Sequence, residues 1–435
     1  MKKKLVIVGA LGITVAITAA YAANLLPGEI DPISQIDRAA FSDEQIELGE
    51  NLARLGDCST CHTLPGERAM SGGLGLPTPF GMIYSTNITP APDTGIGTWS
   101  YAAFERAMRE GIDREGVHLY PAFPYDHFAG TTDEDLDALY QFLMTQDPVE
   151  AEQVPNDLGF PFSFRPLLAG WKLLFHRPAP FTPNPDFTDE ENRGAYLAET
   201  LGHCSACHSP RNALGAVRRS AFFAGGEAEG WLVPPLGEAS ISPLGWDSDD
   251  YADYLFDGWS ANHGIAGGPM TAVVDNLYDA DEDDVFAMAA WLARITPPVD
   301  EDARAARNLE IAALDLPESF DASLSGEDVS DEIRHGAQVF RDSCLKCHRE
   351  RIAETQPNSL GLTYAVNAPE PTNVFNVVRH GIVPSFGSTA RKMEAVALAD
   401  ADLVALAAFL RWQFTDLPAW ENIAEQAAAS AVQVH

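Results

Sequence analysis

The feature that most constrains this chain is a short cysteine motif that occurs three times. The sequence C-x-x-C-H contains all six cysteines of the 435 residues: Cys58, Cys61 and His62; Cys204, Cys207 and His208; Cys344, Cys347 and His348. Two thiols at this spacing can add to the two vinyl groups of one porphyrin, and the following histidine can bind the iron as an axial ligand. The sequence therefore predicts three covalently bound c-type haems.

A structural zinc site and a redox-active dithiol are the alternative interpretations of the motif. Zinc needs four ligands, usually from two pairs close in sequence, whereas these motifs begin far apart, at residues 58, 204 and 344. A dithiol oxidoreductase needs one reactive pair in a βαβ context, not three pairs. Disulfides across a two-residue gap would close very short loops and add little stability. The haem interpretation is therefore favoured.

The surroundings of the motif repeat as well, which indicates a threefold internal repeat. A helix is predicted to lead into each motif, over SDEQIELGENLARLGDC (42–58), TDEENRGAYLAETLGHC (188–204) and SDEIRHGAQVFRDSC (330–344). Each of these helices contains a glycine: Gly49, Gly194 and Gly336. Glycine inside a helix costs about 1 kcal/mol, so three copies predict that another helix crosses closely at each of these positions.

The crossing helix can be identified from its apolar periodicity. The segments TDEDLDALYQFL (132–143), DEDDVFAMAAWL (281–292) and DADLVALAAFL (400–410) have apolar residues at i, i+3, i+4 and i+7 and acids at the start. This pattern is typical of an amphipathic helix whose acids favour the N-terminal end of the helix dipole. Each segment has an aromatic residue just before its last leucine: Phe142, Trp291 and Phe409.

Strand signals are scarce, so the sequence predicts an all-α fold made of three tandem class I cytochrome c-like domains, each with one covalent haem. We expect a signal peptide or membrane anchor over 1–26, domains over 34–150, 188–296 and 328–420, a packed proline-rich connection over 151–187, a linker over 297–327 and a tail over 421–435. The piece RPLLAGWKLLF within the connection is too apolar for a free tether, and we expect it to pack on a neighbouring domain, with membrane or a partner protein as the alternatives.

The N-terminus and the charge balance restrict location and partners. Three lysines precede an uncharged stretch from Leu5 to Leu26, and Ala20-Tyr21-Ala22 fits a signal-peptide cleavage site. The same stretch could span a bilayer uncut, and either outcome predicts the periplasmic side of the inner membrane. The formal net charge is −35, which makes nucleic acid a poor partner and suits a basic surface on another protein.

Between each motif and the following amphipathic helix we expect a second axial ligand. Met270 in GIAGGPM and Met393 in STARKM occupy this place in the second and third repeats, and a thioether suits haem iron. The first repeat has Phe123 instead. His127 is the favoured ligand there, Met82 and His118 are alternatives, and an open five-coordinate iron is the remaining alternative. Arg211 and Asn87 could donate hydrogen bonds to haem propionates.

The chain resembles the triple-haem cytochrome c subunits of bacterial membrane-bound periplasmic dehydrogenases. The resemblance rests on CSTCH, CSACHSPRN and CLKCH, with PFGMIYSTNITP, TGIGTW, LYPAFPYDHF, RPLLAGWKLLF and GGPM between them. It implies that the cysteine pairs hold haem and that the histidines following them, with Met270 and Met393, are axial ligands. Phe123 followed by Asp126 and His127 makes the chain more similar to the partners of molybdenum hydroxylases that act on aldehydes or N-heterocycles.

We therefore expect a non-catalytic electron-transfer subunit that relays electrons from a catalytic dehydrogenase subunit, with a small iron–sulfur subunit, to ubiquinone, a terminal oxidase or a small cytochrome. The runner-up is the cytochrome subunit of a quinoprotein or flavoprotein alcohol or sugar dehydrogenase. A multi-haem enzyme with an open iron is a third hypothesis, motivated by Phe123. No flavin, nicotinamide or molybdenum signature is evident, so a partner must supply the electrons.

Overall fold

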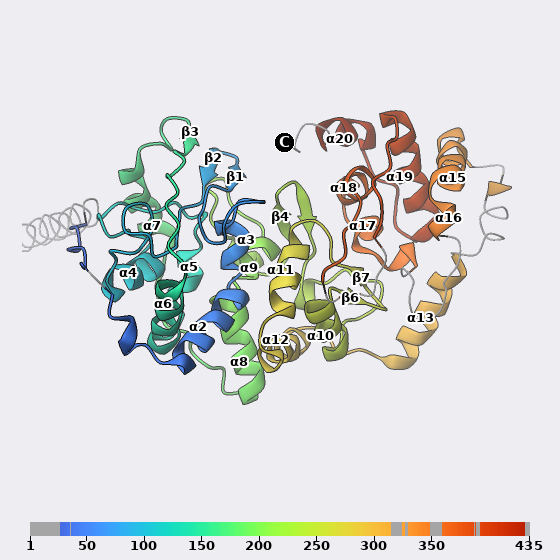
Figure 1. The fold of residues 1–435 in the computed structure, drawn as a ribbon. Helices are drawn as coiled ribbons and strands as arrows, with labels where there is room; N and C mark the ends of the chain where they lie inside the picture. Colours follow the sequence, from blue (N-terminus) through green and yellow to red (C-terminus); the bar gives the residue numbers. More distant parts are fainter. Residues whose placement is uncertain are drawn as a thin grey trace, which may run out of the picture. The chain divides into compact units, whose positions relative to one another are not determined.

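A computed structural model describes residues 27–34, 36–314, 324–326, 329–348, 359–386, 388 and 392–430 (Figure 1). These residues form two compact units. Unit 1 runs to Pro183 and includes Glu199–His203; unit 2 comprises Asn184–Ala198 and the chain from Cys204 onward. Within the described ranges, no helix combines the length and the apolar character that a membrane span requires. The predicted signal peptide or anchor, residues 1–26, lies outside them.

Unit 1 combines helices with one small sheet. Its elements are η1 (Arg38–Ala40), α2 (Asp43–Leu55), α3 (Cys58–His62), β1 (Gly75–Thr78), β2 (Gly81–Tyr84), α4 (Tyr101–Glu110), α5 (Tyr125–Phe128), α6 (Asp133–Thr145), β3 (Asp157–Leu158), η2 (Arg165–Leu167) and α7 (Leu168–Phe175). The strands are antiparallel in the order β1-β2-β3, with Gly75 opposite Tyr84 and Gly81 opposite Leu158.

Unit 2 contains the second and third motifs. It begins with α8 (Asp189–Glu199), whose last residue belongs to unit 1. The elements that follow are α9 (Ser205–His208), η3 (Arg219–Ala221), β4 (Gly226–Ala228), β5 (Trp231–Val233), η4 (Gly237–Ala239), α10 (Ser248–Asp257), β6 (Trp259–Ser260), β7 (Gly264–Ile265), α11 (Pro269–Tyr278), α12 (Glu282–Arg294), α13 (Glu301–Leu314), α15 (Asp331–Ser343), α16 (Leu345–His348), η5 (Leu360–Leu362), α17 (Tyr364–Asn367), α18 (Thr372–His380), α19 (Asp400–Phe414) and α20 (Ile423–Ser430).

The strands correct the expectation of an all-α fold. They are two to four residues long and pair only with near neighbours in sequence, apart from β3. Strands this short give no recognisable period-2 pattern, so the sequence did not reveal them. The β4–β5 hairpin, for example, turns at Glu229 and Gly230, both with positive φ (50° and 77°), as two-residue hairpin turns require.

The three predicted helix pairs form, and each crosses at its glycine. A Cβ on Gly49 would lie 2.1 Å from the carbonyl oxygen of Ala138 in α6, and one on Gly336 would lie 1.9 Å from that of Ala405 in α19. A Cβ on Gly194 would likewise lie 1.9 Å from the carbonyl oxygen of Ala287 in α12. The first helix of each repeat therefore packs backbone against backbone on the amphipathic helix, which confirms the prediction.

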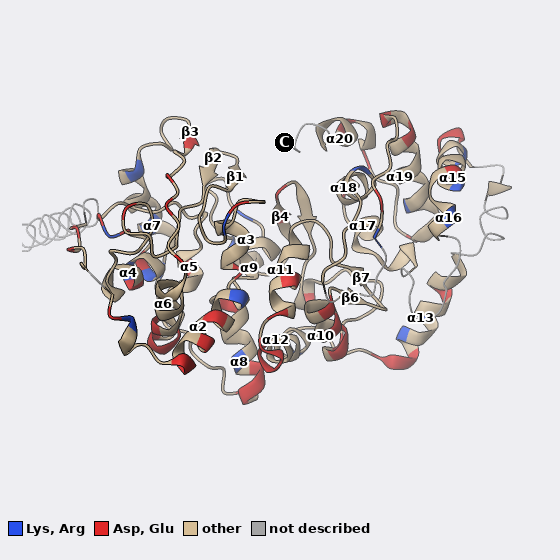
Figure 2. Ribbon diagram, viewed as in Figure 1, with Lys and Arg blue, Asp and Glu red and all other residues tan. Residues whose placement is uncertain are grey.

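The helix starts are fixed by side-chain caps. The Ser42 hydroxyl accepts from the Gln45 amide at 3.2 Å, and Thr188 and Glu191 form a reciprocal capping box. The Thr132 hydroxyl accepts from the Asp135 amide at the start of α6, and three acids follow Thr132 in the first turn. Acidic residues also occupy the first turns of α8 and α12 (Figure 2). Much of the negative charge thus complements helix dipoles.

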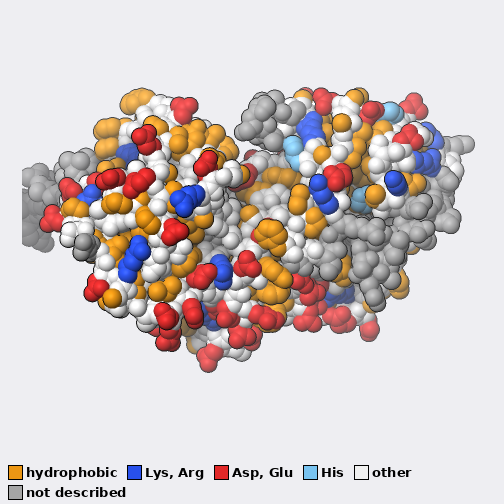
Figure 3. All heavy atoms as spheres, viewed as in Figure 1, with side chains coloured by type: hydrophobic (Ala, Val, Ile, Leu, Met, Phe, Trp, Pro, Cys, Tyr) orange, Lys and Arg blue, Asp and Glu red, His pale blue; other side chains and the backbone are white. Residues whose placement is uncertain are grey.

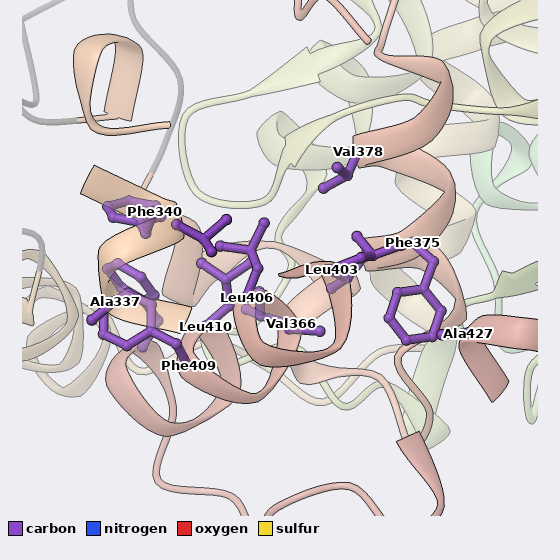
Figure 4. Close-up of a cluster of buried hydrophobic side chains, with 14 residues drawn as sticks. Ala337, Phe340, Val366, Phe375, Val378, Leu403, Leu406, Phe409, Leu410 and Ala427 are labelled. Atoms are coloured by element: carbon purple, nitrogen blue, oxygen red, sulfur yellow. The ribbon is translucent and has the colours of Figure 1, made fainter. Parts of the chain in front are cut away.

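The third repeat shows how such a pair builds a core. Side chains from α15, α17, α18 and α19 meet around Phe340, Leu403, Leu406 and Phe409, which are at most 1% exposed (Figure 4). Phe409 is the predicted aromatic before the last leucine, and its ring packs on Phe340 with centroids 5.6 Å apart. The spacing of the repeat places an aromatic residue beside the glycine crossing, since the Cβ atoms of Phe142 and Phe409 lie 2.7 Å from the Cβ positions of their glycines.

The connection 151–187 packs on unit 1 through a buried lysine. Lys172 of α7 is 5% exposed, and its ammonium donates to the carbonyls of Glu110 and Gly111 at 2.6 and 2.7 Å. The same nitrogen lies 3.0 Å from His118 Nδ1 and above the Tyr125 ring. Burial lowers the pKa of Lys172 to about 7, against the opposing charges of Glu110 and Asp113.

The segment 297–327 is partly helical rather than a plain linker. Its helix α13 is tied to α10 by Arg304, which forms ion pairs with Asp247 and the buried Asp250. His263 lies 3.3 Å from the Asp250 carboxylate and stacks on Trp246, with ring centroids 3.6 Å apart. Burial raises the pKa of Asp250, but hydrogen bonds from His263 and Asn262 and the charges of His263 and Arg304 outweigh it, so the pKa is well below 3.8.

The glycine crossing gives a direct stability test. Gly336→Ala should destabilise the protein by about 2 kcal/mol or more, because the added carbon meets a backbone carbonyl that cannot turn away, and this exceeds the gain of about 1 kcal/mol in helix propensity. Gly159→Ala is the control, since nothing lies within 4 Å of its Cβ position. Denaturant unfolding measures both; equal stabilities would contradict the crossing.

The buried carboxylate gives a pH test. Asp250→Asn should cost about 3 kcal/mol at neutral pH because it leaves Arg304 without a buried partner. A carboxylate with a lowered pKa stabilises the fold above its ordinary pKa of 3.8 and loses that contribution as pH falls towards its folded value. The difference in unfolding free energy between parent and variant should therefore stay constant above about pH 4 and shrink below it. The exposed Asp93→Asn is the control, and a difference independent of pH would contradict this ionisation state.

Candidate haem sites

Each C-x-x-C-H motif contains a short helical turn that begins shortly after the first helix of its repeat, as α3 follows α2, α9 follows α8 and α16 follows α15. In the second motif the amide of His208 donates to the carbonyl of Cys204 at 3.0 Å, and in the third His348 donates to Cys344 at 3.1 Å. Residues three and four apart lie on one side of such a turn, so two thiols and one imidazole face the same region. All six cysteines are described, and none is joined in a disulfide.

The imidazoles of the first two motifs are oriented by backbone carbonyls. His62 Nδ1 donates to the Thr86 carbonyl at 2.6 Å, and His208 Nδ1 donates to the Pro234 carbonyl at 2.8 Å. A proton held on Nδ1 leaves the lone pair on Nε2, which is the arrangement that a metal-binding histidine requires. The donor set of these two sites therefore fits an axial haem ligand.

Burial keeps these histidines neutral. It lowers the pKa of His62 and lowers that of His208 to about 4, although the carbonyl hydrogen bonds act in the opposite direction. Burial also lowers the pKa of His348. Only a neutral imidazole can bind a metal, so the protein favours the ligating form of all three at neutral pH. Burial raises the pKa of the Cys58 thiol to about 12, with Asp57 and Cys61 adding to the effect, which does not favour a reactive dithiol.

Met270 lies at the start of α11, and Met393 lies in an isolated β-bridge. The residue before α11, Gly268, has φ 59°, and the Trp231 ring lies 2.6 Å from its Cβ position. Only glycine allows this contact, which fixes the loop GGPM beside the β4–β5 hairpin. Met393 exchanges two backbone hydrogen bonds of 2.9 Å with Ile382. The backbone at or next to each methionine is thus held in place by specific contacts.

The loops that carry these two methionines are neighbours within unit 2. The Ile382 side chain lies 3.9 Å from the Cβ position of Gly267, three residues before Met270. Ile382 is also the bridge partner of Met393. The methionine loops of the second and third repeats therefore meet through one isoleucine.

Side-chain amides hold this neighbourhood together. Asn373 of α18 both donates to the Leu232 carbonyl and accepts from the Leu232 amide, at 2.8 and 2.9 Å. Asn376 donates to the Gly230 carbonyl at 2.9 Å. The Ser385 hydroxyl donates to the Asp257 carbonyl at 2.8 Å. The second and third repeats are thus joined by specific polar contacts.

The candidates for the sixth ligand of the first haem lie in different environments. His127 belongs to α5, its Nδ1 lies 3.1 Å from the Asp126 carboxylate, and its ring centroid lies 6.4 Å from that of His203. Phe123 packs edge-on against Phe128. Met82 lies on β2, where its sulfur comes within 3.1 Å of the Cβ position of Gly75.

His118 has a structural function that the sequence did not indicate. It is 2% exposed, and its Nδ1 contacts the buried ammonium of Lys172. Asn87 is likewise committed to the protein, since its amide donates to Thr94 and to the Val149 carbonyl. Arg211 donates to the carbonyls of Ala206 and Gly215, so it braces the second motif from its own loop. Asn87 and Arg211 thus have partners within the protein, and their hydrogen bonds to haem propionates stay a prediction.

The carbonyls of Thr86 and Pro234 are functional groups that sequence reasoning missed. Thr86 comes 24 residues after His62 in the sequence, and Pro234 comes 26 residues after His208. The near-equal spacing and the proline-containing sequences TNITP and VPP were the available signal. Among the residues that the structure describes, no cluster of three or more His, Cys, Asp or Glu side chains is arranged to hold a metal ion.

Comparison with known proteins gives two family matches. Residues 46–147 match the cytochrome c family, and residues 331–410 match the family described as cytochrome c oxidase, cbb3-type, subunit III. The matched ranges include the first and the third C-x-x-C-H motif with its helix pair. Cytochrome c domains are therefore present in the chain.

The relatives extend the similarity across most of the chain. Gluconate 2-dehydrogenase cytochrome c subunit of Pantoea cypripedii is 35% identical over 366 residues, which cover 79% of each chain. Fructose dehydrogenase cytochrome subunit of Gluconobacter japonicus is 36% identical over 70% of this chain and 64% of its own. One of the subunits of nicotinate dehydrogenase from Pseudomonas putida is 40% identical over 93% of this chain, which spans only 34% of that longer protein.

The fold and the histidine geometry define a c-type cytochrome with more than one cytochrome c domain. The chain belongs to the family of cytochrome c subunits of dehydrogenases, as its similarity to the gluconate enzyme's subunit shows.

Removal of the predicted methionine ligand should open one iron. Met270→Ala should increase by one the number of carbon monoxide molecules bound per reduced protein, because a five-coordinate ferrous haem accepts this ligand. Met288→Leu is the matched control, since Met288 is a core side chain of α12 with 2% exposure and the change conserves volume. Spectroscopic titration measures the binding; an unchanged stoichiometry would show that Met270 is not a ligand.

Proposed function

We propose that this protein is the electron-transfer subunit of a periplasmic dehydrogenase and that it relays electrons through three covalent c-type haems. The observation that carries the proposal is the repeated combination of C-x-x-C-H with an imidazole whose Nδ1 is held by a carbonyl, at His62 and His208. The third motif has the same helix pair, and its His348 is half-buried. Haem c, when bound, supplies one-electron redox chemistry.

The residues of the chain divide the work of holding each haem. In each motif the two cysteines would form the covalent links and the following histidine would bind the iron. Met270 and Met393 would be the second ligands of the second and third haems, and His127 is the favoured second ligand of the first haem, with Met82 as the alternative. Thioether and imidazole ligands give different reduction potentials, so these choices would set the direction of electron flow.

The contact between the two methionine loops supports transfer within unit 2. Ile382 touches the loop of Met270 and is paired with Met393. Electrons pass between redox centres without a mobile carrier only where the protein holds the centres close and rigid. The hydrogen bonds of Asn373 and Asn376 with the backbone of Leu232 and Gly230 provide this rigidity between the second and third repeats.

The proposed location is the periplasmic side of the inner membrane, supported by the lysines and apolar stretch of residues 1–26. The proposed partners are a catalytic subunit and a small iron–sulfur subunit as electron donors, with ubiquinone, a terminal oxidase or a small cytochrome as acceptor. A molybdenum hydroxylase acting on aldehydes or N-heterocycles is the favoured donor, because a relative that matches 93% of this chain belongs to nicotinate dehydrogenase.

A quinoprotein or flavoprotein dehydrogenase is the second candidate donor. The relatives from fructose and gluconate dehydrogenases support it. A multi-haem enzyme with an open iron is the weaker alternative, and it rests on Phe123 in the first repeat.

A paired-cysteine variant tests the relay in its own membrane. Cys204→Ala with Cys207→Ala should lower the mass of the protein by one haem and abolish substrate-dependent oxygen uptake by membranes. A panel of nicotinate, aldehydes, ethanol, fructose and gluconate identifies the donor class, since only one class should lose oxygen uptake. Dehydrogenase activity with an artificial dye is the control and should persist, because the catalytic subunit is untouched.

Three outcomes would contradict the proposal. A parent protein with no haem mass would exclude the haem sites. Unchanged oxygen uptake in the variant would exclude the second haem from the relay. Conversion of a substrate by the purified chain alone would favour the multi-haem enzyme.

A further inference from the structure

The connection between the first two repeats presents a large apolar face to solvent. We call the apolar face the side chains of Phe160, Phe162, Phe164, Leu167, Leu173 and Leu174. Phe160 is 87% exposed, and Leu173 and Leu174 are 61% and 63% exposed. Hydrophobic side chains gather over the part of unit 1 that carries β3 (Figure 3). So many exposed large apolar side chains within fifteen residues of chain indicate an interaction site.

The face is fixed in place by contacts on its inner side. Lys172 and Ala169 of α7 are buried in unit 1, so Leu173 and Leu174 must point outward. The Tyr120 hydroxyl donates to the Phe162 carbonyl at 2.9 Å, and Phe162 packs on Phe80 with ring centroids 4.5 Å apart. The exposure is therefore built into the fold and does not result from a loose loop.

The charge of this segment is opposite to that of the chain. From residue 158 to residue 185 there is no Asp or Glu, whereas Arg165, Lys172 and Arg177 lie within it. The formal net charge of the whole protein is −35. Lys172 is buried, but Arg177 is exposed and Arg165 is half-buried above the Tyr120 ring. An apolar face with cations at its edge and no acids is typical of a surface that lies on anionic lipid.

Residues 27–30, which follow the uncharged N-terminal stretch, are attached to the loop of unit 1 that follows α4. Ile30 donates to the Arg114 carbonyl at 2.9 Å, and Arg106 donates to the Gly28 carbonyl at 2.7 Å. A few residues later in that loop, the His118 carbonyl accepts from Arg165, the cation of the apolar face. The described chain, which starts at Pro27, therefore begins on the loop of unit 1 that also contacts Arg165.

We propose that the apolar face of residues 160–174 lies on the surface of an anionic phospholipid bilayer, with its phenylalanine and leucine side chains among the acyl chains and Arg165 and Arg177 at the phosphates. Lipid is favoured as the occupant because residues 158–185 contain cations and no acids, although the whole chain is strongly acidic, and this local charge is complementary to anionic headgroups. The inference goes beyond the electron relay, which requires no particular membrane-facing surface.

A lipid photolabelling experiment tests this surface in the full, haem-loaded chain. The protein is mixed with vesicles of phosphatidylglycerol that contain a phospholipid with a photoactivatable acyl chain, and labelled peptides are identified by mass spectrometry. Label should appear in the peptides that cover residues 158–177. The triple change Phe160→Ser, Leu173→Ser and Leu174→Ser should reduce that label by at least about tenfold, because apolar burial in the interface is lost.

The matched control removes exposed apolar side chains elsewhere. Leu309→Ser, Val383→Ser and Phe386→Ser alter residues that are 62% to 84% exposed outside the face, and they should leave the label unchanged.

Vesicles of phosphatidylcholine should give less label than vesicles of phosphatidylglycerol, because phosphatidylcholine headgroups carry no net charge to attract the arginines. Equal label would contradict the anionic preference. Label confined to residues 1–26 would overturn the proposal, as would protection of residues 158–177 by a catalytic subunit in the isolated complex. The haem content and reduction potentials are measured separately, so failure of the lipid proposal would not contradict the proposed electron relay.

Discussion

The repeated structure depends on one close contact, in which a glycine of one helix lies against a backbone carbonyl of another. At Gly49, Gly194 and Gly336 the space for a single methyl group is already occupied by the facing peptide. Dispersion and apolar burial at such short range fix the distance between the two helices of each pair. Because each C-x-x-C-H turn comes shortly after the first helix, this contact also helps to position the thiols and the imidazole.

The haem sites add a second layer of positioning to this scaffold. A carbonyl from a later loop, that of Thr86 or Pro234, sets the orientation of the imidazole, and burial favours its neutral form. The helix pair that crosses at the glycine therefore positions each site, and the loop carbonyl orients the histidine of the first two sites.

The sequence predicted the helix pairs because their signals are local and repeated. Glycine, the capping residues Ser42 and Thr188, and the 3.6-residue periodicity each indicate a structure on their own. The strands β1–β7 were missed because they are too short for a periodic signal, and their pairing depends on turns such as Glu229-Gly230. The partners of His118 and Asn87 were missed because they are tertiary: Lys172 lies 54 residues beyond His118, and Val149 lies 62 residues beyond Asn87. No local pattern encodes such contacts.

The pairing of Asn373 with both backbone groups of Leu232 has a consequence for the modular history of the chain. The side-chain amide imitates one rung of a β-ladder, so the hairpin edge is closed by a residue from a different repeat. A third repeat without this amide would leave that rung unpaired and would weaken the join between the two repeats, which Asn376 and Ser385 would still hold. Since Leu232 contributes only its backbone groups, the join depends on the side chain at residue 373 and not on the side chain of its partner.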